Sequence, residues 1–317
     1  MLPSSIVVLG AGAFGTALAR VMAQAWPECT VVLWNRSSHV LQSLGQGEHP
    51  RLGPVKDLPH NVVFETDFSA ALEQSSWIVL AVALSAWPCL PKTVWSNRHH
   101  VIVAAKGMIA SLFPTEWIED QWPQVKVSVM GGPHLAKELT ESSYSVGMSL
   151  ATRDDALDHM FQNCPPFMTQ RTTDLLGLQF WGAIKNVAAM IASYVREVTQ
   201  SANTTASVMA RLWNEAWVLS EKLGCQRDTA FSYAGFGDWF LTCHSPQSRH
   251  TQLGKFLAQG SQSFAQFPQT ADGPLTLQAL CDRIDRHEQI IPSFSAFLTR
   301  LHAYTDPKAL CHRLLTA

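Results

Sequence analysis

A glycine-rich turn at residues 10–15, GAGAFG, limits the possible folds of this chain more than any other feature. It follows the charge-free run Ile6–Leu9, which has the composition of a buried strand, and it opens a stretch with helical spacing, Ala13–Ala25. Between a strand and a helix, the first glycine of GxGxxG permits a tight turn. The second lets the backbone approach a pyrophosphate, and the third allows close helix–strand packing. The alternative is a glycine turn that binds nothing, but strand, turn and helix together favour a dinucleotide site. The residues expected to bind the dinucleotide here are Gly10, Gly12, Ala13, Phe14 and Gly15.

The 317 residues fall into two halves of different character, which suits two domains better than one. Short runs that are apolar on both faces alternate with helical patterns in the first half, as in a parallel sheet covered by helices. The expected strands are Ile6–Leu9, Thr30–Trp34, Val62–Phe64, Trp77–Val82, Val101–Ala105, Val127–Met130 and Ser145–Leu150. After Asp174, segments with helical spacing replace them, at 176–198, 203–223, 228–242, 248–259, 274–287 and 293–303. We therefore predict an α/β fold, with a Rossmann-type doubly wound sheet in residues 1–174 and an all-helical, substrate-binding domain in 175–317.

Composition excludes several classes of function. A net charge of −2 gives no sign of a nucleic-acid-binding or polybasic membrane surface. Seven cysteines without a CxxC pair are typical of reduced thiols in a cytoplasmic protein, and they predict neither a disulfide framework nor a zinc site. The N-terminus has no basic region typical of a signal peptide, and Lys185 or Pro88 interrupts the longest apolar stretches, so we expect no membrane span.

The end of the second predicted strand bears on the choice of cofactor. An acidic residue there would hold the ribose 2′-hydroxyl of NAD, but this chain has Trp34-Asn35-Arg36. Arg36 could pair with a 2′-phosphate, which favours NADP(H) and leaves NAD(H) possible. The alternative is an exposed arginine that contacts no ligand.

Lys185 is the only charged residue in the apolar run Leu175–Val195. A charge in such surroundings is costly unless it is paired, and burial moves a lysine pKa towards neutrality, where the group can exchange a proton. Lys185 is therefore the first candidate for acid/base chemistry. The alternative is a surface lysine whose stem lies along a helix, and on this residue alone that alternative is favoured.

Four further motifs occur in order along the chain: Lys106-Gly107, Gly132-Pro133-His134-Leu135-Ala136-Lys137-Glu138, Gly182-Ala183-Ile184-Lys185-Asn186-Val187, and Gly235-Phe236-Gly237-Asp238 with Leu241-Thr242-Cys243 and Ser248-Arg249-His250. As an ordered set they resemble bacterial NAD(P)-dependent sn-glycerol-3-phosphate dehydrogenase, from Ile6 to about Phe297. The resemblance implies reversible hydride transfer between NAD(P)H and dihydroxyacetone phosphate. The product, sn-glycerol 3-phosphate, is a phospholipid precursor.

The resemblance also implies roles for single residues. Lys185 matches the catalytic lysine, and Asp238 is expected to orient it. The positions that match or replace substrate contacts are Lys106, Gly132, His134, Lys185, Asp238, Ser248, Arg249 and His250. Beyond the glycine turn and Arg36, those beside the cofactor are Lys106, Ala136, Arg249 and Asp272. We expect a phosphorylated triose as substrate, no metal, and a homodimer, the common default.

The residues themselves support two of these roles. Reduction of a ketone leaves a developing alkoxide that needs a proton donor, and an ammonium such as that of Lys185 also stabilises the negative charge. Asp238 lies near glycines in an expected loop, where it could orient Lys185. The alternative for Asp238 is a turn or N-cap aspartate. Ser248 is expected to begin a helix, with Arg249 and the helix N-terminus holding a phosphate, or else to be an ordinary serine cap.

Several residues depart from the family pattern. His134 stands in place of Ser or Thr, His250 in place of Asn, Asp272 in place of Glu, and Trp181 in place of Gly one helical turn before Lys185. A tryptophan there could narrow the substrate site or displace it. The family's glycine-rich loop is absent from residues 196–205, which predicts a stiffer, more helical segment.

These departures leave two alternatives beside the dehydrogenase. One is a related NAD(P)-dependent dehydrogenase of another small hydroxy compound. The other is a catalytically degenerate sensor that binds a dinucleotide without turnover, against which the retention of both Lys185 and Asp238 argues.

Overall fold

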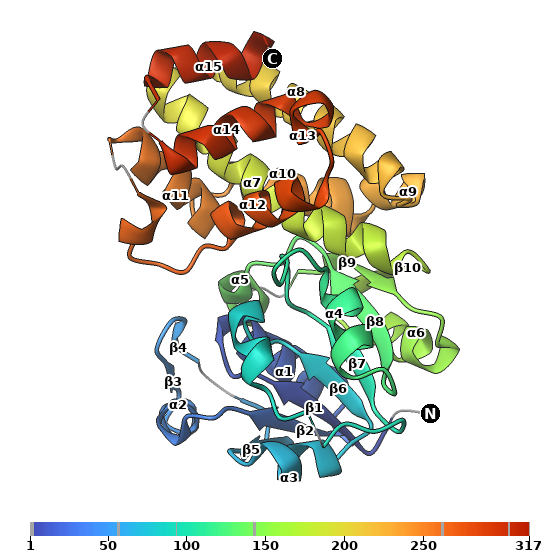
Figure 1. The fold of residues 1–317 in the computed structure, drawn as a ribbon. Helices are drawn as coiled ribbons and strands as arrows, with labels where there is room; N and C mark the ends of the chain where they lie inside the picture. Colours follow the sequence, from blue (N-terminus) through green and yellow to red (C-terminus); the bar gives the residue numbers. More distant parts are fainter. Residues whose placement is uncertain are drawn as a thin grey trace. The chain divides into compact units, whose positions relative to one another are not determined.

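The computed structural model describes residues 3–55, 58–92, 94–141, 144–260, 263–303 and 305–316. The chain forms two compact units (Figure 1). Unit 1 comprises Met1–Ala105 and Pro114–Leu175, and unit 2 comprises Lys106–Phe113 and Leu176–Ala317. The short segment Lys106–Phe113 thus belongs with the C-terminal helices, although we expected it in the N-terminal domain. A domain boundary after Asp174 remains a prediction.

Unit 1 contains an eight-stranded sheet in the order β10-β9-β8-β7-β6-β1-β2-β5. Its strands are β1 (Ser5–Leu9), β2 (Thr30–Trp34), β5 (Val62–Glu65), β6 (Trp77–Leu80), β7 (His100–Val103), β8 (Lys126–Gly131), β9 (Val146–Ala151) and β10 (Phe167–Thr172). All neighbouring strands are parallel except β8 and β9. The predicted doubly wound α/β class is therefore confirmed, and the seven predicted strands are all present. The eighth strand, β10, was not predicted.

Helices and a small hairpin complete unit 1. They are α1 (Ala13–Ala25), α2 (Ser38–Gly45), the hairpin β3 (Glu48–His49) and β4 (Gly53–Pro54), α3 (Phe68–Glu73), a 3₁₀ turn at Leu84–Cys89, α4 (Pro114–Gln121), α5 (Ala136–Glu141) and α6 (Asp155–Gln162). Both faces of the sheet are covered, because consecutive residues of β1, Ile6 to Leu9, are all fully buried. Packed tryptophans, among them Trp87, Trp117 and Trp122, form another part of the core.

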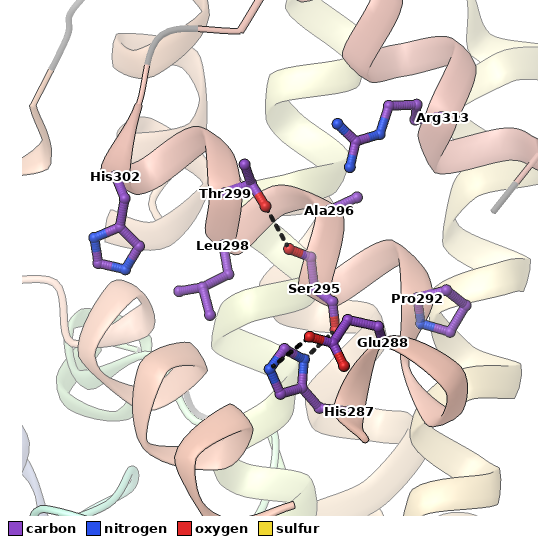
Figure 2. A pocket seen from close by; sticks show the side chains of 9 residues that line it. All are labelled: His287, Glu288, Pro292, Ser295, Ala296, Leu298, Thr299, His302 and Arg313. Atoms are coloured by element: carbon purple, nitrogen blue, oxygen red, sulfur yellow. Dashed lines mark hydrogen bonds and ion pairs between the residues drawn. The ribbon is translucent and has the colours of Figure 1, made fainter. Parts of the chain in front are cut away.

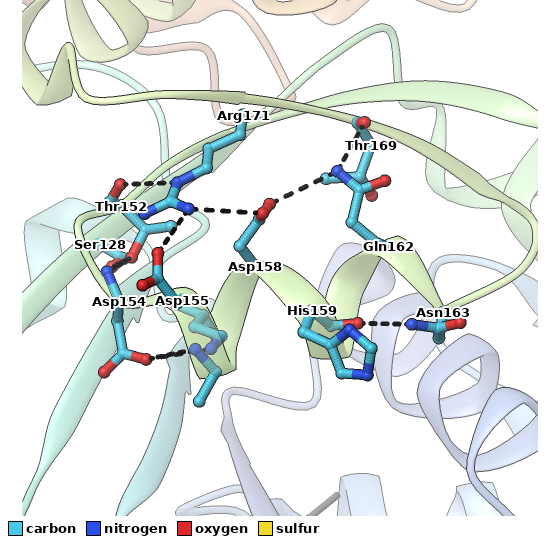
Figure 3. A network of polar contacts seen from close by, with 12 residues as sticks. Ser128, Thr152, Asp154, Asp155, Asp158, His159, Gln162, Asn163, Thr169 and Arg171 are labelled. Carbon is cyan, nitrogen blue, oxygen red and sulfur yellow. Dashed lines mark hydrogen bonds and ion pairs between the residues drawn. The ribbon is translucent and has the colours of Figure 1, made fainter. Parts of the chain in front are cut away.

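A polar network joins α6 to the outer strand β10 (Figure 3). Arg171 on β10 lies 2.6 Å from an Asp155 carboxylate oxygen and 3.6 Å from one of Asp158. Asp154 caps α6 by accepting hydrogen bonds from the N–H groups of Ala156 and Leu157. Because only Phe167 of β10 is buried, these bonds supplement its apolar packing at the edge of the sheet.

Unit 2 is helical and is built around α7 (Leu175–Thr199), of which residues 177–195 are all buried. The other helices are α8 (Ala202–Lys222), α9 (Arg227–Ala230), a π-helical turn at Tyr233–Gly237, α10 (Asp238–His244), α11 (Arg249–Ala258), a 3₁₀ turn at Phe264–Gln266, α12 (Gly273–Arg283), α13 (His287–Ile290), α14 (Pro292–His302) and α15 (Pro307–Thr316). By length and composition α7 could cross a membrane, but 89% of its most apolar 18-residue window is buried inside the protein. It is a core helix of this unit.

Two predicted helices are interrupted in the structure. The segment 228–242 is divided into α9, the π-helical turn and α10, and 274–287 ends at Arg283 before the short α13. The helical character predicted for 196–205 is confirmed: α7 continues to Thr199, and α8 begins at Ala202. Only Gln200, with φ of +49°, and the helix cap Ser201 separate the two helices. The predicted stiffness remains a prediction.

Candidate active site

The glycine turn joins β1 to α1 in unit 1, as its sequence predicts. Gly10 has φ of +112°, in the region that favours glycine, and a Cβ on Gly15 would lie 1.9 Å from the Gly10 carbonyl oxygen. The N–H groups of Gly10 and Ala11 both donate to the Trp34 carbonyl at the end of β2. The first and third glycines are therefore required by the fold itself.

The second glycine meets a different requirement. A Cβ built on Gly12 has nothing within 4 Å, and no side chain caps the N-terminus of α1 there. Open space beside free backbone N–H groups is what a pyrophosphate needs. The residues present therefore fit a dinucleotide. Arg36 is exposed just beyond β2, where a 2′-phosphate could reach a guanidinium.

The predicted residues after β8 also lie in unit 1. A Cβ on Gly132 would be 2.6 Å from the Gly147 carbonyl oxygen, so this position requires glycine. The His134 ring packs against Phe14 of the glycine turn at 6.0 Å between centroids, and its Nε2 lies 3.0 Å from the Gly147 carbonyl oxygen. Ala136 begins α5. His134 thus contacts the predicted dinucleotide loop directly.

The two catalytic candidates meet in unit 2, with two further residues. The Lys185 ammonium donates hydrogen bonds to Asp238 Oδ1 at 2.5 Å and to Thr242 Oγ1 at 2.8 Å. The Lys106 ammonium donates to Asp238 Oδ2 at 2.5 Å. Asp238 is 1% exposed, and Lys185 is 6% exposed. Lys106 is partly exposed. Two ammonium groups and one carboxylate leave the cluster with an excess positive charge, which suits a substrate that is anionic or becomes so.

The charges of the cluster determine its proton chemistry. Burial lowers the pKa of Lys185 to about 8, although the Asp238 carboxylate opposes this shift. Burial alone would raise the pKa of Asp238, but Lys106 and Lys185 hold it below its usual value. An ammonium has three N–H groups, and Asp238 and Thr242 accept two of those on Lys185. In the described part of the chain no side chain or carbonyl accepts the third, which is therefore available to a substrate oxygen.

Local backbone features place the members of this cluster. We expected Asp238 in a loop, but it begins α10, directly after the π-helical turn. That turn requires Gly235, because a Cβ there would lie 2.2 Å from the Ala230 carbonyl oxygen. Single π turns occur often at functional sites. On α7, Gly182 lies beside the stem of Lys106, whose Cγ is at an ordinary contact distance of 3.5 Å from the position of a Cβ at residue 182.

The predicted phosphate-binding residues lie at the start of α11, also in unit 2. Ser248 caps this helix by accepting a hydrogen bond from the Thr251 N–H, so its hydroxyl acts as an ordinary serine N-cap. Arg249 is exposed and donates to the Thr270 carbonyl. His250 is buried, with Nε2 2.8 Å from Asp272 Oδ1. Burial alone would raise the pKa of Asp272, but its hydrogen bond with His250 contributes to holding it below the usual value. His250 and Asp272, which both differ from the family pattern, thus contact each other directly.

Trp181 lies in the core of unit 2. Its side chain is fully buried, with ring centroids 4.6 Å from Trp213 and 6.3 Å from Trp239. Trp239 directly follows Asp238, so Trp181 supports the start of α10 through an aromatic contact.

Two other features of the chain have the outward form of a site. In unit 1, His100 lies 2.8 Å from Ser128 Oγ and 3.4 Å from an Asp154 oxygen, which resembles a hydrolase triad. Ser128 is fully buried and donates to Thr152, so no substrate can reach it.

In unit 2, a cavity of about 470 Å³ is lined by residues including His287, Ser295, His302 and Arg313 (Figure 2), and none of the predicted site residues lines it. Among the described residues, no group of His, Cys, Asp or Glu side chains is arranged to hold a metal.

Sequence reasoning missed two residues that the structure adds. Thr242 was noted only as part of a motif, but its spacing of four residues from Asp238 on α10 places both side chains on one face. His49 gave no signal at all. It is buried in the β3–β4 hairpin and contacts the Ala11 carbonyl oxygen in the glycine turn.

Comparison with known proteins identifies the family. Residues 5–156 match the model for the N-terminus of NAD-dependent glycerol-3-phosphate dehydrogenase, and residues 174–312 match that for its C-terminus. The chain is 31% identical over 287 residues to glycerol-3-phosphate dehydrogenase [NAD(P)+] of Azotobacter vinelandii, which covers 87% of this chain and 83% of that protein. The same enzyme of Francisella philomiragia is 29% identical over 327 residues, or 98% of this chain and 97% of the relative.

Solved structures support the fold. A crystal structure of glycerol-3-phosphate dehydrogenase from Coxiella burnetii has a TM-score of 0.84 at 24% identity, and it covers 99% of both chains. The Plasmodium falciparum enzyme has a TM-score of 0.87 at 16% identity, over 98% of this chain and 95% of that one. With both family models matched in order and a 31% identical relative along most of its length, the chain belongs to the NAD-dependent glycerol-3-phosphate dehydrogenase family.

Proposed function

We propose that this protein is an NAD(P)-dependent oxidoreductase that reduces dihydroxyacetone phosphate to sn-glycerol 3-phosphate for phospholipid synthesis. The observation that carries this proposal is the Lys185–Asp238–Lys106 cluster in a chain of this family. When bound, the reduced nicotinamide supplies the hydride for the carbonyl carbon. The protein must supply the proton for the carbonyl oxygen.

Lys185 is suited to supply that proton. Its third N–H can hydrogen-bond to the carbonyl oxygen, stabilise the charge that develops there, and then transfer the proton to complete the alcohol. Asp238 and Thr242 hold the ammonium in one orientation through the other two N–H groups. Lys106 adds a second positive charge beside Asp238.

The remaining assignments concern binding. We propose that Gly10, Gly12, Ala13, Phe14, Gly15 and Ala136 border the cofactor, with Arg249 and Asp272 also beside it. Gly132 and His134 would contact the substrate, and the exposed Arg249 with the α11 N-terminus would hold its phosphate, beside Ser248 and His250. Arg36 favours NADPH over NADH. All seven cysteines are free thiols, in keeping with a cytoplasmic protein, and we propose a homodimer.

The assay that tests this function follows cofactor oxidation when the protein is mixed with NADPH or NADH and dihydroxyacetone phosphate. We expect turnover with both cofactors and a higher kcat/KM with NADPH. Absence of turnover with either cofactor would contradict the proposal. A panel of other small ketones tests the second candidate function, a dehydrogenase of another hydroxy compound. This candidate is motivated by His250, a departure from the family pattern whose ring is paired with Asp272.

The rate should depend on pH through Lys185, whose pKa lies near 8. Reduction needs the protonated amine, so kcat/KM should be level below this pKa and fall above it, approaching about tenfold per pH unit. Oxidation of glycerol 3-phosphate needs the neutral amine and should rise through the same range. Asp238 raises this pKa, so Asp238→Asn should move the pH profiles of reduction and of oxidation to lower pH. If both profiles stay unchanged in this variant, the titration belongs to another group.

A further inference from the structure

The inference concerns His49, a residue of the β3–β4 hairpin that lies far along the sequence from the glycine turn. The ring is 4% exposed, and three backbone groups surround it. Its Nδ1 accepts hydrogen bonds from the N–H groups of Arg51 and Leu52, both at 3.0 Å. Its Nε2 lies 3.2 Å from the Ala11 carbonyl oxygen.

These contacts determine the form of the ring. A nitrogen that accepts two N–H groups carries no proton, so the neutral imidazole has its hydrogen on Nε2. Nε2–H therefore donates to Ala11, which lies between the first two glycines of the turn. The bond ties the glycine turn to the hairpin.

The bond also fixes the direction of a neighbouring N–H group. In a planar trans peptide, the carbonyl of residue 11 and the N–H of residue 12 point in opposite directions. Holding the Ala11 oxygen against His49 therefore aims the Gly12 N–H away from the ring. Gly10 and Ala11 already donate to Trp34, so among the described residues the Gly12 N–H is the first of the turn left for a ligand.

We propose that His49 is a positioning residue for dinucleotide binding, which acts by orienting the Ala11–Gly12 peptide towards the pyrophosphate. This inference rests on the proposed use of NAD(P)(H). Protonation would place a hydrogen on Nδ1 against the Arg51 and Leu52 N–H groups. Dinucleotide affinity should thus weaken when His49 becomes charged.

The surroundings of His49 favour its neutral form. Burial lowers its pKa, the bond to Ala11 opposes this, and Arg51 lowers it further. The neighbouring elements contribute the exposed Glu48 on β3 and the exposed His39 on α2, and the first turn of α1 has no acidic residue. Loss of affinity is therefore expected only as the pH falls below the ordinary histidine value of 6.5.

Two substitutions test the contacts of Nδ1 and of Nε2 separately. In His49→Asn, the amide oxygen can replace Nδ1 towards Arg51 and Leu52, but the side chain is too short to reach Ala11. In His49→Gln, the amide N–H can replace Nε2–H towards Ala11. His99 provides a matched control, because it is 1% exposed, accepts a bond from the Ser96 N–H, and contacts a carbonyl, that of Leu72, outside the turn.

The experiment measures the Kd of NADPH by calorimetry and the thermal midpoint of each variant, across pH. We expect His49→Asn to weaken binding about tenfold, His49→Gln to stay within about threefold of wild type, and His99→Asn to lower the midpoint without changing Kd. The acid weakening of wild type should disappear in both His49 variants. Equal affinity of His49→Asn and wild type, or equal losses in Asn and Gln, would overturn the proposal. Failure of the wild type to bind either dinucleotide would instead refute the proposed function and this inference with it.

Discussion

Replacing Lys185 with alanine should lower kcat for the reduction of dihydroxyacetone phosphate by about 10³-fold or more. A positioned general acid contributes about 10²–10⁴-fold, and loss of the ammonium also removes charge stabilisation of the developing alkoxide. The variant should still fold, because Asp238 keeps its ion pair with Lys106 at 2.5 Å and is not left as an unpaired buried charge. Steady-state kinetics, with circular dichroism to verify folding, measure this effect.

Two further variants separate charge from proton transfer at this position. Lys185→Arg keeps a positive charge beside Asp238, but a guanidinium does not release a proton near neutral pH, so most of the loss should remain. Lys255→Ala is the matched control in the same unit, since this lysine has a 58% exposed side chain and only a distant ion pair, 3.9 Å, with Glu197. It should leave kcat unchanged. A folded Lys185→Ala enzyme within tenfold of wild type would remove Lys185 from the chemistry.

The fold could be predicted where a local pattern determines it. β1, the glycine turn and α1 follow from charge-free residues, the GxGxxG spacing, and helical spacing. β10 has no such pattern, because only its first residue, Phe167, is buried, and the consecutive residues Gln170 and Arg171 are polar and exposed. Its pairing with β9 is a long-range property that no short window contains.

The interruption of the predicted helix 228–242 has a similar cause. Helical spacing continues through this segment, but Gly235 allows a π-helical turn in which a side chain would collide with the Ala230 carbonyl. A glycine within a helical pattern indicates a break only if the packing around it is known. The start of α10 at Asp238, directly after this turn, therefore could not be located from the sequence.

The candidate site was only partly visible in the sequence. An isolated lysine in an apolar run needs a partner, but its partner is 53 residues away, and only the family resemblance suggested Asp238. Lys106 was expected beside substrate and cofactor, and the structure adds its bond to the same carboxylate. His49 could not be found at all, because its function depends on which backbone groups surround the ring.

Replacing Gly12 with alanine should weaken dinucleotide binding at least tenfold while leaving the protein as stable as before. The backbone of Gly12, with φ of −77° and ψ of 175°, suits alanine, and the new methyl group would meet no protein atom within 4 Å. The space that it would occupy is the space through which the backbone approaches a pyrophosphate. Calorimetric titration with NADPH and thermal unfolding measure the two quantities separately.

Gly15→Ala should show the opposite pattern. Its methyl group would be placed 1.9 Å from the Gly10 carbonyl oxygen, and the clash is with backbone, so α1 must shift away from β1. We expect a loss of several kcal/mol, at least about 3, in the free energy of unfolding, because a strained contact at a close approach belongs among the largest single-residue effects. Binding would then fail through the fold. If Gly12→Ala bound NADPH as tightly as wild type, or lost as much stability as Gly15→Ala, the open space beside Gly12 would not be the place where a pyrophosphate is held.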